Sequence, residues 1–320
     1  MTMLCSVLHL LVDGLCVCCL YLMASSDDWY SPSSSAWHLV GIFLTYNILA
    51  FLTQPLTGLW ADRMERRHWM LLASVLLLTT AVLATSIVIS YGLLSNGVMV
   101  VAILLGMGNS LFHVWGGKQV AVTTSNDMRA LGAFVSTGAF GLALGIVFFS
   151  WTLLYAALLA ICLLSTAYVN LNAKAGTTEA VNQPIECRFS RMFIWVSLLV
   201  LMLVVMLRSL VGETFTGEIS KTSGLVLLIG FLSMLGKMVG GWLARQWGII
   251  RMLVLIVLLV AVCLVFKDQG MVILLVGLFA VNCTMPITLY LANVVLPKRE
   301  GLAFGLLAAA LIPGYLLAIL

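Results

Sequence analysis

Three ionisable side chains of this sequence lie inside long apolar stretches, where a charge needs a chemical reason. His9 and Asp13 are four residues apart, so a helix places both on one face. A carboxylate and an imidazole on one face could share a proton and bind it reversibly. His113 lies in another apolar run, beside Asn109 and Ser110. We expect Asp13 first, then His9 and His113, to serve proton coupling; the alternative is that they only hydrogen-bond neighbouring helices and never titrate.

Two cations also fall within apolar runs, Arg208 and Lys237. If both face a central cavity, they favour an anionic or partly anionic substrate. Two alternatives stay open: Arg208 snorkels to the lipid headgroups, or the cations pair with an acid such as Glu213. The amides of Gln54, Asn109 and Asn282 are further candidates for substrate binding, or for tying two helices together.

The elements that position these residues follow from composition. Of 320 residues, 62% are hydrophobic and only 9% are charged, whereas a soluble domain carries about a quarter charged residues. This composition excludes a soluble enzyme and a nucleic-acid binder, and makes membrane lipids the surroundings of the chain. The eight cysteines mostly lie inside apolar runs, and no pair has zinc-ligand spacing on a loop, so we expect no metal site and no cofactor.

A bilayer core needs about 20 apolar residues per helix. Eleven runs qualify: 3–24, 37–60, 68–91, 97–117, 130–150, 152–171, 191–212, 223–244, 249–266, 271–296 and 301–320. No strand-like alternation appears, so we predict an all-α polytopic membrane protein. The polar stretch 172–190 divides the chain into an N-terminal bundle of six helices (1–171), a cytoplasmic linker (172–190) and a C-terminal bundle of five helices (191–320).

The basic residues orient the chain. With the N-terminus in the cytoplasm, twelve of them fall on inner loops and only Lys221 and Lys267 on outer loops. The inner twelve are Arg63, Arg66, Arg67, Lys118, Arg129, Lys174, Arg188, Arg191, Arg245, Arg251, Lys298 and Arg299. We therefore expect a multi-pass protein of the cell (inner) membrane with a cytoplasmic N-terminus.

An internal repeat links the two halves. A constant offset of 183 aligns Gly58 with Gly241 and Ala61 with Ala244, each near the cytoplasmic end of the second helix of its half. Weak internal symmetry of this kind is typical of a duplicated transporter.

The segment 58–67, GLWADRMERR, resembles the signature loop of the major facilitator superfamily. Its parts have readable physical roles: Gly58 permits close helix approach, and Asp62 can cap a helix or pair with a base. The basic residues of the loop favour the anionic cytoplasmic leaflet; they are Arg63, Arg66 and Arg67. Two departures are Glu65, where the family pattern usually has glycine, and Arg245, which replaces the acid in the second copy.

Further segments sharpen the resemblance. His9-x-x-x-Asp13, Gln54-Pro55, the run 106–113 (GMGNSLFH), Leu207-Arg208-Ser209 and the run 296–302 (LPKREGL) are similar to the fosmidomycin-resistance family of efflux proteins. The resemblance covers nearly the whole chain and implies two rocking bundles and twelve helices, so the last helix would be lacking here. Val114-Trp115 stand where that family usually has Pro-Glu, which removes an expected acid.

The fifth run carries three glycines at helical spacing, Gly138, Gly141 and Gly145. In antiporters of the superfamily a glycine-rich fifth helix packs against the opposite half, which is what the resemblance implies for this run. Ordinary helix packing is the alternative.

These observations predict a major facilitator fold of two six-helix-type bundles that exports a small, possibly anionic, drug-like compound against an inward flow of protons. Alternatives are an uptake porter for an organic anion and a non-transporting protein derived from a carrier. A membrane enzyme would need a catalytic cluster at the interface; the one paired acid, Asp27-Asp28, has no metal-ligand company, so we predict no enzyme. A monomer with a small-molecule substrate and protons as partners is expected.

Overall fold

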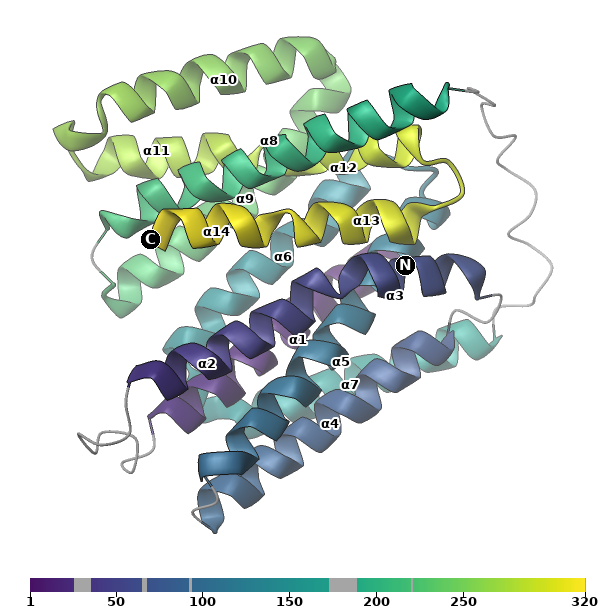
Figure 1. The fold of residues 1–320 in the computed structure, drawn as a ribbon, viewed down its shortest axis with the longest axis vertical. Helices are drawn as coiled ribbons and strands as arrows, with labels where there is room; N and C mark the ends of the chain where they lie inside the picture. Colours follow the sequence, from purple (N-terminus) through teal and green to yellow (C-terminus); the bar gives the residue numbers. More distant parts are fainter. Residues whose placement is uncertain (26–35, 65–67, 92–93, 173–188, 220, 320) are drawn as a thin grey trace.

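The computed structural model describes residues 1–25, 36–64, 68–91, 94–172, 189–219 and 221–319 (Figure 1). Across these ranges the regular structure is helical, with nine helices long and apolar enough to cross a membrane. Two shorter apolar helices, Phe149–Leu164 and Ile249–Val265, bring the described total to eleven. The predicted all-α polytopic fold with eleven helices is thus confirmed.

The first half of the chain supplies seven labelled α-helices. They are α1 (Thr2–Ala24), α2 (Ala36–Asn47), α3 (Gln54–Arg63), α4 (His68–Ser90), α5 (Leu94–Thr123), α6 (Met128–Val147) and α7 (Thr152–Asn172). A π-helical turn, η2 (Ile48–Leu52), joins α2 to α3, so that these elements form one span over Val40–Arg63. The short 3-10 helix η3 (Phe149–Trp151) precedes α7.

The second half supplies the other seven. They are α8 (Arg191–Gly217), α9 (Ser223–Trp247), α10 (Ile249–Val265), α11 (Met271–Asn282), α12 (Thr284–Val295), α13 (Glu300–Ala309) and α14 (Leu311–Ile319). The 3-10 helix η4 (Lys267–Gln269) lies between α10 and α11. The pairs α11–α12 and α13–α14 each make one span, Met271–Val295 and Glu300–Ala318.

Proline explains why three spans are interrupted. Pro55 stands in the first turn of α3, Pro286 in that of α12 and Pro313 in that of α14. Proline has no N–H, and its ring clashes with the carbonyl four residues earlier, so a helix breaks just before it. Each break frees backbone groups inside a span, which is tolerated in a membrane where neighbouring helices satisfy them.

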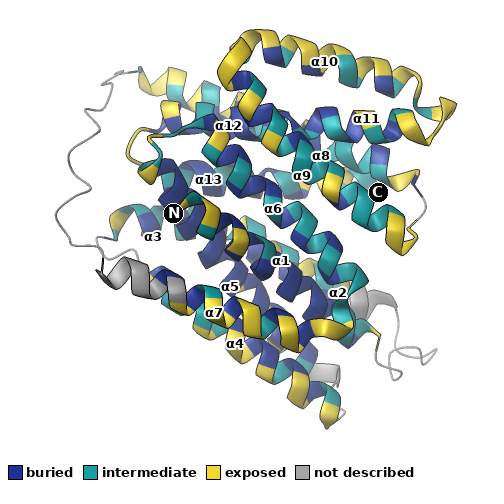
Figure 2. Cartoon of the chain, turned by 180° about the vertical axis from the view of Figure 1, so that it is seen from behind, coloured by how far each residue is buried: buried dark blue, intermediate teal, exposed yellow. Residues whose placement is uncertain are grey.

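The two halves lie side by side, with α1 to α5 and α7 on one side and α8 to α14 on the other (Figure 1). Helix α6 of the first half runs along α9 of the second, and α3 runs along α13. Helices α1 and α5 are the most enclosed, whereas α10, α7 and α4 present many exposed residues on the flanks (Figure 2). Exposed apolar side chains on flanking helices are expected where lipid takes the place of water.

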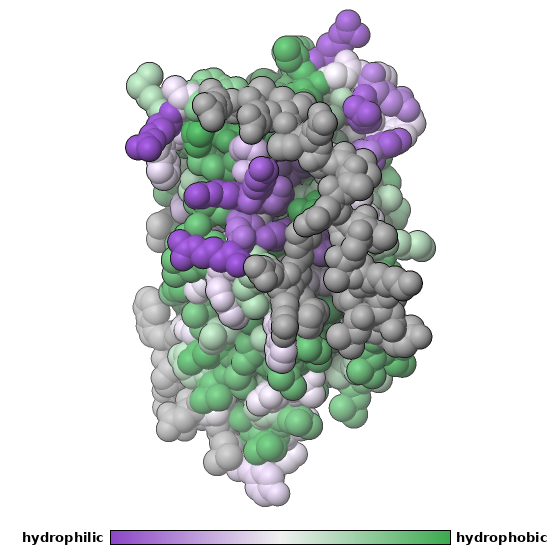
Figure 3. Space-filling view, turned by 90° about the vertical axis from the view of Figure 1, so that its right-hand side faces the viewer, coloured by the Kyte–Doolittle hydropathy of each residue, from purple (hydrophilic) through white to green (hydrophobic). Residues whose placement is uncertain are grey.

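One end of the bundle carries the charges. At the end where α3 stops and α13 starts, exposed Arg63, Arg245 and Arg299 accompany the helix termini. Hydrophilic side chains gather at this end, above a mainly hydrophobic flank (Figure 3). We call it the basic end; under the predicted orientation it faces the cytoplasm.

Lys118 lies in a different place from the one predicted. The sequence predicts it on an inner loop, whereas α5 continues to Thr123 and buries its side chain. Most of the predicted linker, together with Arg66, Arg67 and the pair Asp27-Asp28, lies outside the described residues. The linker and domain boundaries therefore stay predictions.

Candidate functional site

Two helices of the first half bring the three predicted proton-coupling residues into one buried cluster. His9 and Asp13 project from one face of α1, as their spacing predicts, and His113 projects from α5. Their exposed fractions are 4%, 7% and 6%. We call these three residues the His-Asp-His cluster.

Hydrogen bonds hold every member of the cluster. His9 Nδ1 lies 2.7 Å from the carbonyl oxygen of Phe134 on α6, and His113 Nδ1 lies 2.9 Å from that of Asn109 on its own helix. The two Nε2 atoms face one another at 2.8 Å. Asp13 lies 3.3 Å from His9 Nε2 and 3.4 Å from His113 Nε2, and it accepts a hydrogen bond of 3.0 Å from the Asn109 amide.

Two imidazoles and a carboxylate are also a donor set that transition metals accept, and one ligand atom from each lies within 4.8 Å of the others. In a tetrahedral site with metal–nitrogen bonds of about 2.0–2.1 Å, two ligand nitrogens stand roughly 3.3 Å apart. The observed 2.8 Å is the separation of a hydrogen bond. The geometry therefore favours a proton between the rings over a metal ion.

Neighbouring helices close the cluster on two sides. A Cβ atom added at Gly138 of α6 would collide with Asp13 Oδ2 and His9 Nε2, so only glycine fits there. From the second half, Phe304 of α13 packs on Phe134 with ring centres 6.1 Å apart, and on His113 at 6.5 Å. The cluster thus lies at the seam between the two halves, with an aromatic ring of the second half over it.

Arg208 of α8 is 8% exposed, which does not match snorkelling to the headgroups. A guanidinium has five N–H donors, yet the one hydrogen bond it makes to a described residue goes to the thioether sulfur of Met285, a weak acceptor. No described acid pairs with it; Glu213, one candidate partner, accepts from Thr216. A cation so enclosed and so poorly satisfied is costly.

Lys237 of α9 is half-buried and also lacks a partner. Its ammonium makes no hydrogen bond or ion pair with any residue the structure describes, and it lies within electrostatic range of Arg208 and Asp13. Arg208 and Lys237 therefore form a second group in the second half, the cation pair, which reaches the His-Asp-His cluster electrostatically through Lys237. A positive region of this kind attracts anions.

The three predicted amides lie in three different places. Asn109 orients Asp13 within the cluster. Asn282 donates to the Leu278 carbonyl at 2.8 Å and lies 3.5 Å from Ser233 on α9, which ties two helices of one half together. Gln54 is fully buried at the proline break; its amide nitrogen donates to the Ala50 carbonyl, and its oxygen has no partner among the described residues.

A polar latch joins the halves at the basic end. Asp62, at the end of α3, accepts the backbone N–H groups of Gly301 and Leu302 at 3.0 and 2.9 Å. A carboxylate at a helix N-terminus satisfies free N–H groups and the positive end of the helix dipole. Lys118 Nζ lies 3.1 Å from Asp62 and donates to the Ala61 carbonyl at 2.8 Å. Sequence reasoning missed Lys118, although the polar and apolar run after it, 119–123, indicated that the helix continues.

Glycine allows the latch to form. A Cβ at Gly58 would collide with the Gly301 carbonyl, and one at Gly241 with the carbonyl of Met128. Each glycine of the repeat thus lies against the first turn of a helix in the opposite half, α13 or α6. The two aligned glycines, Gly58 and Gly241, thus have equivalent packing in the two halves.

A second polar contact crosses the halves at the turn before α6. Asn126 donates to the Tyr290 carbonyl at 3.2 Å and accepts from Asn293 at 2.8 Å, both on α12. The next residue, Asp127, caps α6 by accepting the Arg129 N–H. Hydrogen bonds from the Arg129 side chain, with a smaller contribution from the charge of Arg245, lower the pKa of Asp127. The sequence does not predict this contact, because asparagine is common in turns whether or not it contacts another helix.

Gly138, Gly141 and Gly145 line the face of α6 that packs on α1. A Cβ at Gly141 or Gly145 would collide with the backbone of Leu10 or Gly14. These glycines therefore contact the first half, while other residues of α6, such as Gly132 and Ala143, meet α9 of the second half.

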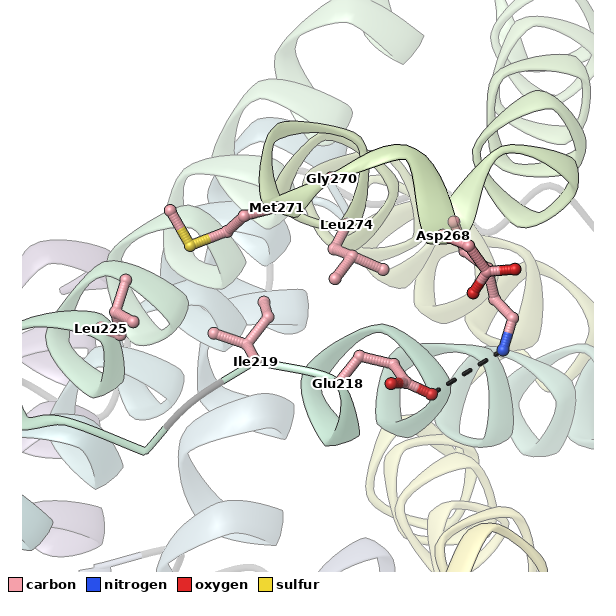
Figure 4. A pocket seen from close by; sticks show the side chains of 8 residues that line it. Glu218, Ile219, Leu225, Asp268, Gly270, Met271 and Leu274 are labelled. Carbon is pink, nitrogen blue, oxygen red and sulfur yellow. Dashed lines mark ion pairs between the residues drawn. The ribbon is translucent and has the colours of Figure 1, made fainter.

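A separate pocket of about 350 Å³ opens at the other end of the second half, between the ends of α8, α9 and α11 (Figure 4). Lys267 and Glu218 form an ion pair of 3.8 Å across its rim, and Ile219 and Leu274 line its floor. None of the predicted site residues lines it. It is a surface depression apart from the seam.

Comparisons with known proteins agree with this architecture. The model of the Major Facilitator Superfamily matches residues 3–318. A comparison with curated protein sequences finds no significant match.

Among solved structures, the chain is similar to the FucP transporter of the Major Facilitator Superfamily in the outward conformation (12% identity, 98% of this chain and 89% of that one, TM-score 0.67). It is also similar to the human organic anion transporter MFSD10 (17%, 99% and 92%, 0.69). A third is a bacterial homologue of the iron transporter ferroportin in the outward-facing state (15%, 97% and 90%, 0.59). At these identities the likeness establishes the fold.

Proposed function

Because this chain belongs to the Major Facilitator Superfamily, we propose that it exports a small, drug-like organic anion by alternating access, driven by inward proton flow. Family membership makes it a multi-pass membrane transporter with a small-molecule substrate. The direction, the charge of the substrate, the coupling to protons, the inner-membrane location and the cytoplasmic N-terminus are the parts we propose. The resemblance to the fosmidomycin-resistance proteins supports export.

The observation that carries the proposal is the cation pair. Arg208 is buried and Lys237 is half-buried, and neither has an acidic partner among the described residues. Burying an unpaired charge costs several kcal/mol in a protein, so a structure tolerates it where a ligand supplies the counter-charge. A carboxylate or phosphonate on the substrate would do so.

The His-Asp-His cluster supports the coupling. Lys237 of the cation pair lies within electrostatic range of Asp13, so a proton bound at the cluster and an anion bound at the cation pair act on each other through their charges. Such differential stabilisation is what shifts a carrier between its two states. Gln54, Asn109 and Asn282 complete the set of candidate residues.

The test is flux in proteoliposomes with an imposed pH gradient. With the basic end facing the lumen, an acidic exterior should drive an anionic antimetabolite out, and Arg208→Gln should abolish that flux. Lys267→Gln, which removes a half-exposed cation at the far pocket, is the matched control and should leave flux unchanged. Gradient-independent flux would contradict proton coupling.

A second candidate is uptake of an organic anion, favoured by the fold shared with a protein named as an organic anion transporter. The cation pair serves either direction. Accumulation along the inward proton gradient in the same vesicles would identify uptake. Anion binding without any flux would instead identify a non-transporting protein derived from a carrier.

A further inference from the structure

We propose that the coupling proton is held between the two imidazoles, on the Nε2–Nε2 axis of His9 and His113, while Asp13 remains a carboxylate that neutralises the pair. This inference rests on the proposed proton coupling and names the atoms that bind the proton. It moves the first candidate for the proton carrier from Asp13 to the histidines.

The argument begins with the two Nδ1 atoms. Each lies within hydrogen-bond distance of a backbone carbonyl: His9 Nδ1 of Phe134, and His113 Nδ1 of Asn109. A carbonyl oxygen only accepts hydrogen bonds, so both Nδ1 atoms must carry hydrogen. In a neutral imidazole the other nitrogen, Nε2, is then a bare lone pair.

The next step concerns the contact between the rings. The two Nε2 atoms are 2.8 Å apart, with the ring planes at 90°. Two bare lone pairs repel at that distance, and a single proton between them turns the contact into a strong, charge-assisted hydrogen bond. The pair therefore carries three N–H protons in all, one more than two neutral histidines, and a charge of +1.

Asp13 supplies the matching negative charge. Its two oxygens lie 3.3 and 3.4 Å from the two Nε2 atoms, and the Asn109 amide donates to one of them. A proton placed on the carboxyl instead would leave the two Nε2 lone pairs facing each other. The cluster as a whole is neutral when it holds one proton, which suits a site inside a membrane.

The polar and charged groups around the cluster come from several helices. Cys16 on α1 lies 3.8 Å from the Asn109 amide, and Tyr46 on α2 reaches the Cys16 sulfur. From the second half, Lys237 on α9 lies within electrostatic range of Asp13. On the other sides Gly138 and Phe304 add no charge.

Loss of the shared proton has a structural consequence. Two lone pairs and a carboxylate would then converge without a hydrogen between them, so the rings must separate and α1 must shift against α5. The compact cluster is therefore the proton-loaded form, and the separated one is the empty form.

Nitrogen-15 NMR of the histidines tests the assignment. The chain has four histidines, so a His38→Gln, His68→Gln background retains only His9 and His113. In nanodiscs we expect both Nδ1 atoms protonated, a scalar coupling between the two Nε2 nuclei, and one joint titration step. In His113→Gln, His9 should lose its partner and bind its proton about tenfold or more weakly.

Infrared spectroscopy of the carboxyl groups provides the second readout. While the histidine pair holds its proton, Asp13 should contribute no band of a protonated carboxyl group. The spectra of the unchanged protein and of Asp13→Asn should therefore agree in that region. Two neutral histidines that titrate independently, or a protonated Asp13, would overturn the shared-proton site. Either result would leave the proposed proton-driven flux intact. Conversely, a shared proton combined with gradient-independent flux would retain the proton site and reject the proposed coupling.

Discussion

At the scale of single residues, the charges of the cation pair should favour anion binding and lower the stability of the fold. Arg208 meets only a thioether and Lys237 has no described partner, so both charges weigh against folding. A residue that serves only to hold helices together would contribute to stability instead. Stability and transport measured on the same variant therefore distinguish the two roles.

We predict that Lys237→Met abolishes anion transport and raises thermal stability. Methionine keeps most of the volume and removes a half-buried charge without a described partner, so we expect a gain at the low end of the about 1–4 kcal/mol seen when buried charges are replaced. The measurements are flux in vesicles and the melting temperature in detergent. Lys267→Met is the control, since an exposed ion pair contributes only about 0–1 kcal/mol. A lower melting temperature for Lys237→Met would mean that the lysine is structural.

The sequence predicts part of the cluster and misses the rest for a definite reason. His9 and Asp13 share a face because helical periodicity is local, and the spacing alone reveals it. That His113 meets them depends on the register between α1 and α5, which is set by side-chain packing over many residues. Nothing in the local pattern could place the two Nε2 atoms together.

At the scale of elements, α13 performs two tasks. Its first turn is bound by Asp62 at the basic end. Less than one turn further on, Phe304 covers the His-Asp-His cluster and lies so close to α5 that only glycine fits at Gly117. One movement of α13 away from α3 would therefore break the latch and uncover the cluster together.

We predict that Phe304→Ala makes the carrier leak protons without substrate. Removing the ring opens a route from the basic end to His113, and a buried Phe→Ala exchange costs about 3–5 kcal/mol of stability. Proton flux in substrate-free vesicles is the measurement. Phe215→Ala is the matched control, because Phe215 is equally buried but packs within the second half on Gly277. Equal leak rates in the two variants would show that Phe304 does not seal the cluster.

The ends of elements explain the other differences between sequence and structure. Spans were assigned by length and apolarity, and α5 was expected to stop before Lys118. A helix can continue past its apolar run when the charge finds a partner, and Asp62 is that partner. Hydropathy places the middle of a helix well, whereas its termini depend on such tertiary contacts.

At the scale of the whole molecule, the two halves repeat one design with reversed charges. Gly58 and Gly241 each pack on the first turn of a helix in the other half. Four residues after each glycine stands a charged residue, Asp62 in the first half and Arg245 in the second. Asp62 caps α13 of the opposite half, whereas α6 is capped by Asp127, which belongs to the same half as α6. An acid thus stands at both helix starts, and the first half of the chain supplies both.

The polar contacts at these two helix starts should differ in strength. Asp62 is enclosed, with its side chain 7% exposed, whereas Asp127 is 25% exposed and already pairs with Arg129, which is 55% exposed. Enclosed charge-assisted hydrogen bonds are the stronger kind, and exposed ion pairs contribute little. The lowered pKa of Asp127 means that its pairing is present at neutral pH and is lost only as the pH falls below the usual range of a carboxyl group.

We therefore predict that Asp62→Asn opens the basic end far more than Arg245→Gln does. Losing a charged helix cap costs about 1–2 kcal/mol, which is roughly a 5- to 30-fold shift between a closed and an open basic end. Spin labels can be placed at positions 63 and 246, which are both exposed and lie in opposite halves. Opening of the basic end would lengthen the distance between the two labels, as measured by double electron–electron resonance. Arg245→Gln should leave that distance distribution nearly unchanged at pH 7. If the two exchanges open the end equally, Asp62 and Arg245 contribute equally to its closure, and the enclosure of Asp62 does not make the latch at α13 the stronger contact.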